Sequence, residues 1–328
     1  MLKAVLLFIV GLVLLIKGGD WFVDGATGIA RRFHVPDLLI GATVVSIGTT
    51  LPEVMVSATS AVSGHGEIAY GNAIGSIICN TALIAALTIA VKPSKVDRKS
   101  LKTPVLFFFI AALYYVFNAY VLGSFTRTSG LILLAVFVIY IGLNIYQVTH
   151  MSETEKAAAL ADSEEMPEED GGSMAKELLL LVVGAALIAV GANLLVNNGT
   201  IIAQELGVPE AVIALTFVAL GTSLPELVTA ITSLAKGHGA LSLGNVIGAN
   251  LFNLVLVCGV SISLAPFDVP ANTTIAGINS SLIMDIPVML FVMLFLTIPA
   301  LIRGKLSRVQ GIILLLIYAA FCVAQFML

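Results

Sequence analysis

Two glutamates that each follow a proline are the residues of this chain most suited to chemistry, because both lie deep inside apolar stretches. Positions 48–53 read GTTLPE and positions 221–226 read GTSLPE, so Glu53 and Glu226 occupy matched places. A carboxylate is costly in hydrocarbon, and a proline interrupts a helix. Their recurrence indicates a built site rather than an accident.

The repeated phrase supplies the oxygen ligands that a dehydrated cation needs. Pro52 has no N–H and clashes with the carbonyl of Gly48, which frees carbonyl groups that lipid cannot satisfy. Calcium prefers roughly six to eight oxygen ligands, and sodium also takes hard oxygen ligands. The candidate ligands are Glu53, the hydroxyls of Thr49 and Thr50 and the carbonyls from Ser46 to Thr49 in the first copy, and Glu226, the hydroxyls of Thr222 and Ser223 and the carbonyls from Ala219 to Thr222 in the second.

Two converging glutamates would give such a site a charge of about −2, which suits one divalent ion or a small set of monovalent ions. When empty, the two carboxylates would repel each other in a medium of low dielectric, so one of them would take up a proton. The site is therefore expected to release one set of ions as another set arrives. Electrostatics alone favours cation exchange.

A second block also recurs at the same spacing. Positions 71–76 read GNAIGS and positions 244–249 read GNVIGA, and each block is followed four residues later by an asparagine, Asn80 or Asn253. Ser76 and Asn80 lie on one helix face, since they are four residues apart. The glycines suit close packing of membrane helices. Asn80 and Asn253 could simply join helices by hydrogen bonds, but their repetition with the glutamates favours a place in the site.

Composition shows what kind of scaffold must hold these residues. Of 328 residues, 59% are hydrophobic and only 11% are charged, and the mean hydropathy is +1.05. These values predict an all-α polytopic membrane protein. Ten apolar stretches of membrane-spanning length are expected, at 3–18, 38–62, 68–91, 104–122, 129–148, 176–196, 210–235, 241–265, 279–301 and 308–327.

One long polar segment divides these helices into two groups of five. Residues 150–175 are acidic and contain Pro167 and a Gly-Gly pair, which is typical of a solvated linker. The predicted domains are therefore 1–149, the linker 150–175, and 176–328. Because five is odd, the second copy enters the membrane from the opposite side. The halves are expected to be inverted repeats with broken helices meeting at the midplane.

Basic residues predict the orientation in the membrane. Nearly all of them fall on the side that holds the linker, and only Lys3 and Arg127 fall on the side of the termini. The positive-inside rule then places the linker in the cytoplasm and both termini outside a cell membrane. The lipid bilayer is the partner this arrangement requires. Nothing in the sequence calls for nucleic acid or an obligatory protein partner.

The two repeated blocks, their duplication and the ten-helix pattern resemble the alpha-repeats of the sodium/calcium exchanger family, within the calcium/cation antiporter superfamily. The resemblance implies an antiporter that exchanges calcium for sodium by alternating access, in which the first and sixth helices slide against the others. It implies a calcium site made by Glu53, Glu226 and the carbonyls of Thr49 and Thr222. It also implies an outer sodium site and an inner one, with Ser76, Ser223, Thr222 and the Ala219 carbonyl in the outer site and Thr50, Thr49 and the Ser46 carbonyl in the inner one.

Two departures from the family pattern concern the coupling ion. Ala249 stands where relatives carry a serine, which removes a hydroxyl from the inner site, and Asn253 stands where many carry an aspartate. A proton-coupled divalent cation exchanger is therefore the alternative, although that branch places a glutamate where this chain has Asn80 and Asn253. An enzyme is not expected, because no Ser/His dyad, paired Asp motif or metal cluster is present. No cofactor is expected beyond transported Ca²⁺ and Na⁺, with H⁺ left open.

Overall fold

The computed structural model describes residues 2–93, 95–151, 173–206, 221–271, 274–275 and 277–327. Nearly all of these residues are helical, and among them are nine helical segments long and apolar enough to cross a membrane, together with the shorter apolar helix Leu224–Ala235. The predicted seventh span, 210–235, is described only from residue 221. Ala219 and most of the predicted linker lie outside the described residues.

The first half is built from these elements in chain order: α1 (Leu2–Phe33), α2 (Asp37–Ile40), η1 (Gly41–Val45), α3 (Ser46–Val62), α4 (Gly66–Cys79), η2 (Asn80–Ala85), α5 (Ala86–Val91), α6 (Arg98–Phe117), η3 (Asn118–Leu122), β1 (Ser124–Phe125) and α7 (Arg127–Thr149). The elements labelled η are single π-helical turns. Three of them, η1, η2 and the later η5, join the α-helical pieces before and after them into continuous spans, whereas η3 ends one span and η6 begins another.

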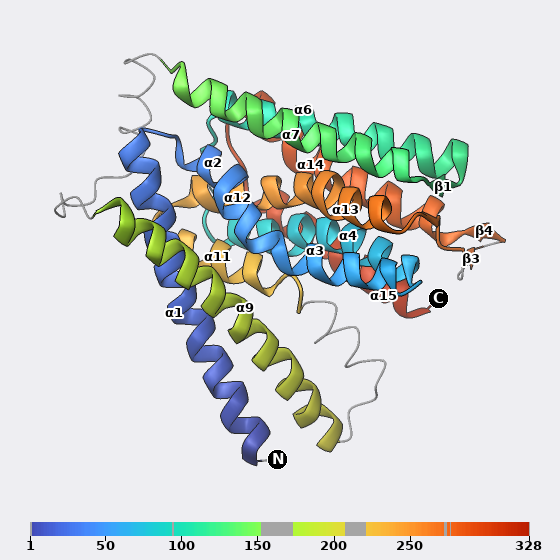
Figure 1. The fold of residues 1–328 in the computed structure, drawn as a ribbon, viewed down its shortest axis with the longest axis horizontal. Coiled ribbons are helices and arrows are strands. Elements are labelled where there is room, and N and C mark those ends of the chain that lie inside the picture. The colour runs from blue at the N-terminus through green and yellow to red at the C-terminus, as the bar shows by residue number, and fades with distance from the viewer. Residues whose placement is uncertain are drawn as a thin grey trace.

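The second half contains α9 (Met174–Glu205), α11 (Leu224–Ala235), α12 (Gly239–Phe252), η5 (Asn253–Val257), α13 (Cys258–Leu264), β2 (Phe267–Asp268), β3 (Thr274–Ile275), β4 (Ile278–Asn279), η6 (Ser281–Asp285), α14 (Ile286–Arg303) and α15 (Arg308–Met327). The short strands pair antiparallel, β1 with β2 and β3 with β4. They lie in the loops at one end of the helical bundle (Figure 1).

The two halves repeat their irregularities as well as their sequence. The spans α4–η2–α5 and α12–η5–α13 begin at Gly66 and Gly239, and their π-helical turns begin at Asn80 and Asn253. Each pair has the same separation in sequence as Glu53 and Glu226. π-helical turns are frequent at functional sites, because they change which side chains face a neighbouring helix. The structure thus places both repeated asparagines at matched distortions.

The interruption near the Pro-Glu pair takes a different form in each half. In the second half, residues 221–223 form a turn and α11 begins directly after it. In the first half, α3 runs on through Pro52, and the irregular turn is η1, which directly precedes α3. A membrane helix tolerates such a proline where neighbouring helices and local π-turns satisfy the backbone groups.

Helices α1 and α9 form an antiparallel pair that projects from the rest of the bundle (Figure 1). A Cβ atom on Gly11 would lie 2.8 Å from the carbonyl oxygen of Gly191, and one on Gly18 would lie 2.9 Å from that of Gly184. Gly11 corresponds to Gly184 in the repeat, and Gly18 to Gly191. The interface therefore maps onto itself when the two halves are exchanged, as an inverted repeat requires.

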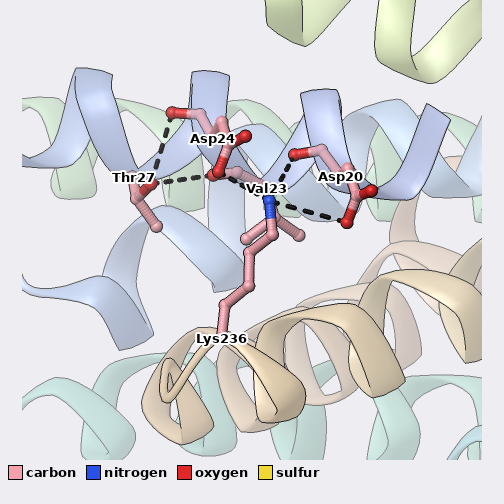
Figure 2. Close-up of polar contacts among 5 residues, drawn as sticks. All are labelled: Asp20, Val23, Asp24, Thr27 and Lys236. Atoms are coloured by element: carbon pink, nitrogen blue, oxygen red, sulfur yellow. Dashed lines mark hydrogen bonds and ion pairs between the residues drawn. The ribbon is translucent and has the colours of Figure 1, made fainter. Parts of the chain in front are cut away.

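Both of these helices are longer than the sequence predicts. The first was expected at 3–18 and is Leu2–Phe33, and the sixth was expected at 176–196 and is Met174–Glu205. The predicted end after residue 18 was wrong because the acidic residues that follow it do not leave the bundle. Asp20 and Asp24 stay helical and contact Lys236 of the second half (Figure 2).

The repeated block of the second half lies at the centre of the molecule. Among the described spans, Gly239–Leu264 is the most buried and Gly66–Val91 is the next, whereas Arg127–Thr149 and Arg308–Gln325 are the least buried. Gly244 and Gly248 make this burial possible, because a Cβ atom on either would collide with the backbone of Leu38 or Ala42. The core therefore brings α12 against α2, η1 and α3.

Candidate cation site

Glu53 and Glu226 meet in the interior, although they come from opposite halves of the chain. Both side chains are fully buried, at 0% exposure. Their carboxylates are close enough for the two charges to interact. Within the described part of the chain, none of the four carboxylate oxygens has a hydrogen-bond partner. Two buried and unpaired carboxylates are strongly unfavourable unless a proton or a cation compensates them.

The start of α11 fixes the position of Glu226. Pro225 lies in the first turn, where its missing N–H costs nothing, and Glu226 follows it in the same turn. The unpaired N–H groups and the helix dipole place partial positive charge at this end. Ser223 precedes the helix, yet its side chain does not cap it. Its hydroxyl faces Ser76 of α4 instead, at 3.5 Å between the two oxygens.

Hydroxyl groups complete the surroundings of the carboxylates. The side chains of Thr49 and Thr50 on α3 lie in range of the Glu226 carboxylate. Both threonines are buried, and among the described residues the Thr50 hydroxyl has no hydrogen-bond partner. Neutral oxygens beside two carboxylates form a donor set for a hard cation.

The spacing of the Ser76 and Ser223 hydroxyl oxygens fits a shared ion better than it fits a strong hydrogen bond. Hydroxyl hydrogen bonds are usually about 2.7–2.8 Å long. Two oxygens that bind one calcium ion at about 2.4 Å, at right angles to each other, are about 3.4 Å apart. The separation of 3.5 Å between the hydroxyls of Ser76 and Ser223 matches the second value.

The remaining predicted residues have varied positions. Asn80 is fully buried, and both polar atoms of its side chain lack a partner within the described residues. Asn253 is also fully buried and donates to the Ala249 carbonyl at 3.0 Å. The Ser46 carbonyl lies 3.5 Å from the Thr49 hydroxyl. Thr222 is half-buried in the turn before α11.

Sequence reasoning missed two asparagines that contact α3 from two different helices. Asn72 of α4 donates to the Glu53 carbonyl at 3.3 Å and to the Ser57 hydroxyl at 2.8 Å. Asn245 of α12 accepts from the Thr49 hydroxyl at 3.2 Å. The signal was present, because these residues are the matched asparagines of the repeated blocks 71–76 and 244–249. Their partners lie on another helix and could not be read from the spacing.

A small pocket joins this site to the α1–α9 pair. The residues that line it on the side of the site are Gly48, Thr49, Pro52 and Pro225, and those on the side of the helix pair are Phe22, Ala185, Ile188 and Ala189. The ring of Phe22 lies against Gly48, where a Cβ atom would approach it to 3.1 Å. Any shift of the helix pair along the bundle would therefore change what covers the site.

An ionic contact joins the helix pair to the helix that carries Glu226. Lys236 follows the last residue of α11 and reaches α1, where its ammonium lies 2.7 Å from Asp24 Oδ1 and donates to the Asp20 carbonyl at 2.9 Å. Figure 2 shows this ammonium between two successive turns of α1. Arg32 of α1 in turn pairs with Glu177 of α9 at 2.9 Å. Charged contacts thus connect α11 to α1 and α1 to α9.

The donor set of the site is dominated by oxygen. Within the part of the chain that the structure describes, no three His, Cys, Asp or Glu side chains come together as metal ligands. The three cysteines, Cys79, Cys258 and Cys322, are free. Two carboxylates with hydroxyl, carbonyl and amide oxygens suit sodium and calcium rather than the softer transition metals.

Comparison with known proteins agrees with this geometry. The family model described as sodium/calcium exchanger protein matches residues 3–146 and 176–327. This chain belongs to the sodium/calcium exchanger family. The family resemblance and the polytopic helical fold predicted from the sequence are thereby confirmed. The unmatched stretch between the two ranges includes the predicted linker.

Proteins similar to this chain include an exchanger of known structure. The sodium/calcium exchanger MaX1 of Methanosarcina acetivorans is 32% identical over 98% of each chain. The inner membrane protein YrbG of Escherichia coli is 35% identical over 82% of each chain. A structure of the sodium-calcium exchanger NCX_Mj, soaked with 2.5 mM Na⁺ and 10 mM Sr²⁺, is 32% identical over 97% of each chain, with a TM-score of 0.78. The chain is thus a multi-pass membrane protein of an exchanger family.

Proposed function

We propose that this protein is a cation antiporter that exchanges calcium for sodium by alternating access through the site around Glu53 and Glu226. The observation that carries the proposal is the pair of fully buried carboxylates without partners among the described residues. Such a pair needs bound positive charge at every stage of a transport cycle. One set of cations therefore leaves as another set enters, which makes the exchange obligatory.

The proposed calcium site lies between the two glutamates, with the carbonyls of Thr49 and Thr222 as further ligands. Sodium ions bind on either side of it. The outer sodium site uses Ser76, Ser223, Thr222 and the carbonyl of Ala219, and the inner site uses Thr49, Thr50 and the carbonyl of Ser46. The oxygen spacing between Ser76 and Ser223 supports the outer site. Asn80 and Asn253 line the cavity between these sites.

Access to the site changes as α1 and α9 move together against the other helices. The close glycine contacts between α1 and α9 support movement as one unit, because the two backbones touch. The pocket between this pair and the site supports the direct effect of such movement on ion access. The basic residues favour a cell membrane location with external termini and a cytoplasmic linker. The proposal requires no cofactor, nucleic acid or protein partner.

Proton coupling is the second candidate, and one observation favours it. Ala249 gives the inner site one oxygen ligand fewer than a serine would, and Asn253 gives the cavity between the sites less charge than an aspartate would. Buried glutamates can bind protons in place of metal ions. In that case the same two carboxylates would exchange a divalent cation for protons.

Calcium uptake into proteoliposomes separates the two candidates. Vesicles loaded with sodium, in a sodium-free medium at equal pH, are compared with sodium-free vesicles under a proton gradient of equal driving force. Uptake driven by the sodium gradient supports the proposal. Uptake driven only by the proton gradient contradicts it and establishes the second candidate. Vesicles that contain the Glu53→Gln protein give the background.

A further inference from the structure

Asn245 lies beside the proposed inner sodium site, although its position in the sequence does not indicate this. It belongs to α12, is fully buried and lies among residues predicted to bind the inner sodium ion. Its Oδ1 atom lies 3.2 Å from the Thr49 hydroxyl and 3.4 Å from the Ser46 hydroxyl, both on α3. The Ser46 hydroxyl also lies 2.9 Å from the main-chain carbonyl oxygen of Asn245 and 2.6 Å from that of Gly41, which brings α12 and α3 together at this level.

Asn245 lies one helical turn before Ala249, on the same face of α12. A serine at position 249 would offer a hydroxyl to the inner site, and alanine offers none. Gly248 allows the backbone of α12 to approach α3 so closely that an added Cβ atom would lie 2.3 Å from the Ser46 hydroxyl. This approach brings the amide of Asn245 to the level of Thr49.

The distances suit an ion ligand. Both separations from Asn245 Oδ1 exceed the usual length of a hydroxyl hydrogen bond, about 2.7–2.8 Å. They lie near the spacing of about 3.4 Å expected for oxygens that share one hard cation. The Thr49 hydroxyl is also 3.5 Å from the Ser46 carbonyl, a second proposed ligand of the same ion. The Thr49 hydroxyl thus lies at spacings compatible with shared coordination from two other oxygens, the Ser46 carbonyl oxygen and Asn245 Oδ1. These oxygens come from two helices.

We infer that the side-chain oxygen of Asn245 is a sodium ligand of the inner site and supplies the oxygen that Ala249 lacks. The inference rests on the proposed sodium-coupled exchange and concerns which residue completes its inner site. An amide oxygen adds a ligand without adding charge. It therefore favours a monovalent ion beside the glutamates and leaves their charge available for calcium.

The test is a sodium titration of the purified protein by thermal unfolding, because a ligand that binds the native state raises the melting temperature. Asn245→Leu removes the oxygen and is expected to raise the half-saturating sodium concentration about tenfold or more, as the loss of an interaction with a charged group does. The calcium titration of the same variant should change less than threefold. The half-saturating cytoplasmic sodium concentration for exchange in proteoliposomes should rise in parallel.

Two further variants test whether the oxygen itself matters. Asn245→Asp keeps an oxygen in the same place, so sodium binding should be retained. Asn245→Leu combined with Ala249→Ser should recover most of the lost sodium affinity, because the serine returns a hydroxyl one turn away. Asn250→Leu is the matched control on the same helix. Asn250 is fully buried and donates to the Thr81 hydroxyl at 2.7 Å, so its loss should lower stability without shifting the sodium titration.

The outcomes separate this inference from the proposed function. If the wild-type protein shows neither sodium-driven uptake nor a sodium-dependent melting temperature, sodium coupling itself fails. If the wild type responds to sodium and Asn245→Leu responds equally, Asn245 is not a ligand, while the proposed function stands. If Asn245→Leu does not fold, Asn245→Asp decides: a loss of sodium binding despite the retained oxygen overturns the assignment.

Discussion

The contact of Lys236 with α1 is expected to bias the position of the α1–α9 pair. Lys236 extends from the end of α11, which carries Glu226, and its ammonium lies 2.7 Å from Asp24 Oδ1 and 2.9 Å from the Asp20 carbonyl oxygen. Movement of α1 against the other helices would break both interactions. Replacing Lys236 with methionine should therefore destabilise the arrangement seen here relative to the alternative one.

Exposure limits the size of this effect. The side chain of Asp24 is 52% exposed and that of Lys236 is 26% exposed. An ion pair so open to solvent contributes about 0.5 kcal/mol. The charged hydrogen bond to the Asp20 carbonyl is less exposed and brings the total to about 1 kcal/mol. A difference of about 1 kcal/mol changes the ratio of two populations about fivefold.

Distance measurements between spin labels would detect this change. One label replaces Ile9 on α1 and the other replaces Ile68 on α4, both of which are exposed, in a background without the three native cysteines. Lys236→Met should shift the balance of the two distance populations about fivefold. In an Asp24→Asn background the same substitution should do less, since the ion pair with Asp24 is already gone and only the contacts with Asp20 remain. An unchanged distance distribution in Lys236→Met would refute the reasoning, and Lys305→Met controls for loss of a positive charge elsewhere.

Three other predictions concern the site and the helix pair. Glu53→Gln and Glu226→Gln should each abolish calcium exchange yet raise the melting temperature of the ion-free protein, because each removes a buried charge that has no partner among the described residues; near-normal transport by either variant would contradict the site. Ala249→Ser should lower the half-saturating sodium concentration more than that for calcium, as paired titrations would show. Gly184→Val should disrupt the α1–α9 contact, because a Cβ atom there would lie 2.5 Å from the Phe22 main-chain nitrogen; unchanged exchange and unchanged melting would count against tight packing of the pair.

The sequence alone predicted that Glu53 and Glu226 meet, because the two residues occupy matched positions of the repeat. A repeat with an odd number of spans must be inverted, and inversion places matched residues on facing helices. Ser76 and Ser223 are not matched residues, because Ser76 corresponds to Ala249 and Ser223 to Thr50; their common site was implied by the family resemblance. The repeat pattern alone could not predict contacts between unmatched residues. Asn245 meets Thr49 of the other half, and no local pattern connects them.

The length of α1 was underestimated for the same reason. Lys17, Asp20 and Asp24 resemble the end of a membrane span when the sequence is read locally. In the structure the two aspartates contact the ammonium of Lys236, a residue more than two hundred positions away in the sequence. A charge that is compensated by a distant partner need not leave the bundle. The helix therefore continues to Phe33.

Within the described residues, the charged contact of α1 has no equivalent at the matched end of α9, and this difference bears on the transport cycle. The residues that correspond to Asp20 and Asp24 are Asn193 and Asn197, and Ser63 corresponds to Lys236. The two asparagines interact with each other, at 2.9 Å, within one helix. Inverted repeats alone would make the two access states nearly equal in free energy, because each half takes the role of the other. The ion contact adds about 1 kcal/mol to one state only, so it shifts the balance between them toward that state. Lys236→Ser, which makes the two ends alike at this position, is therefore expected to bring the two populations closer to equal than Lys236→Arg, which keeps the charge.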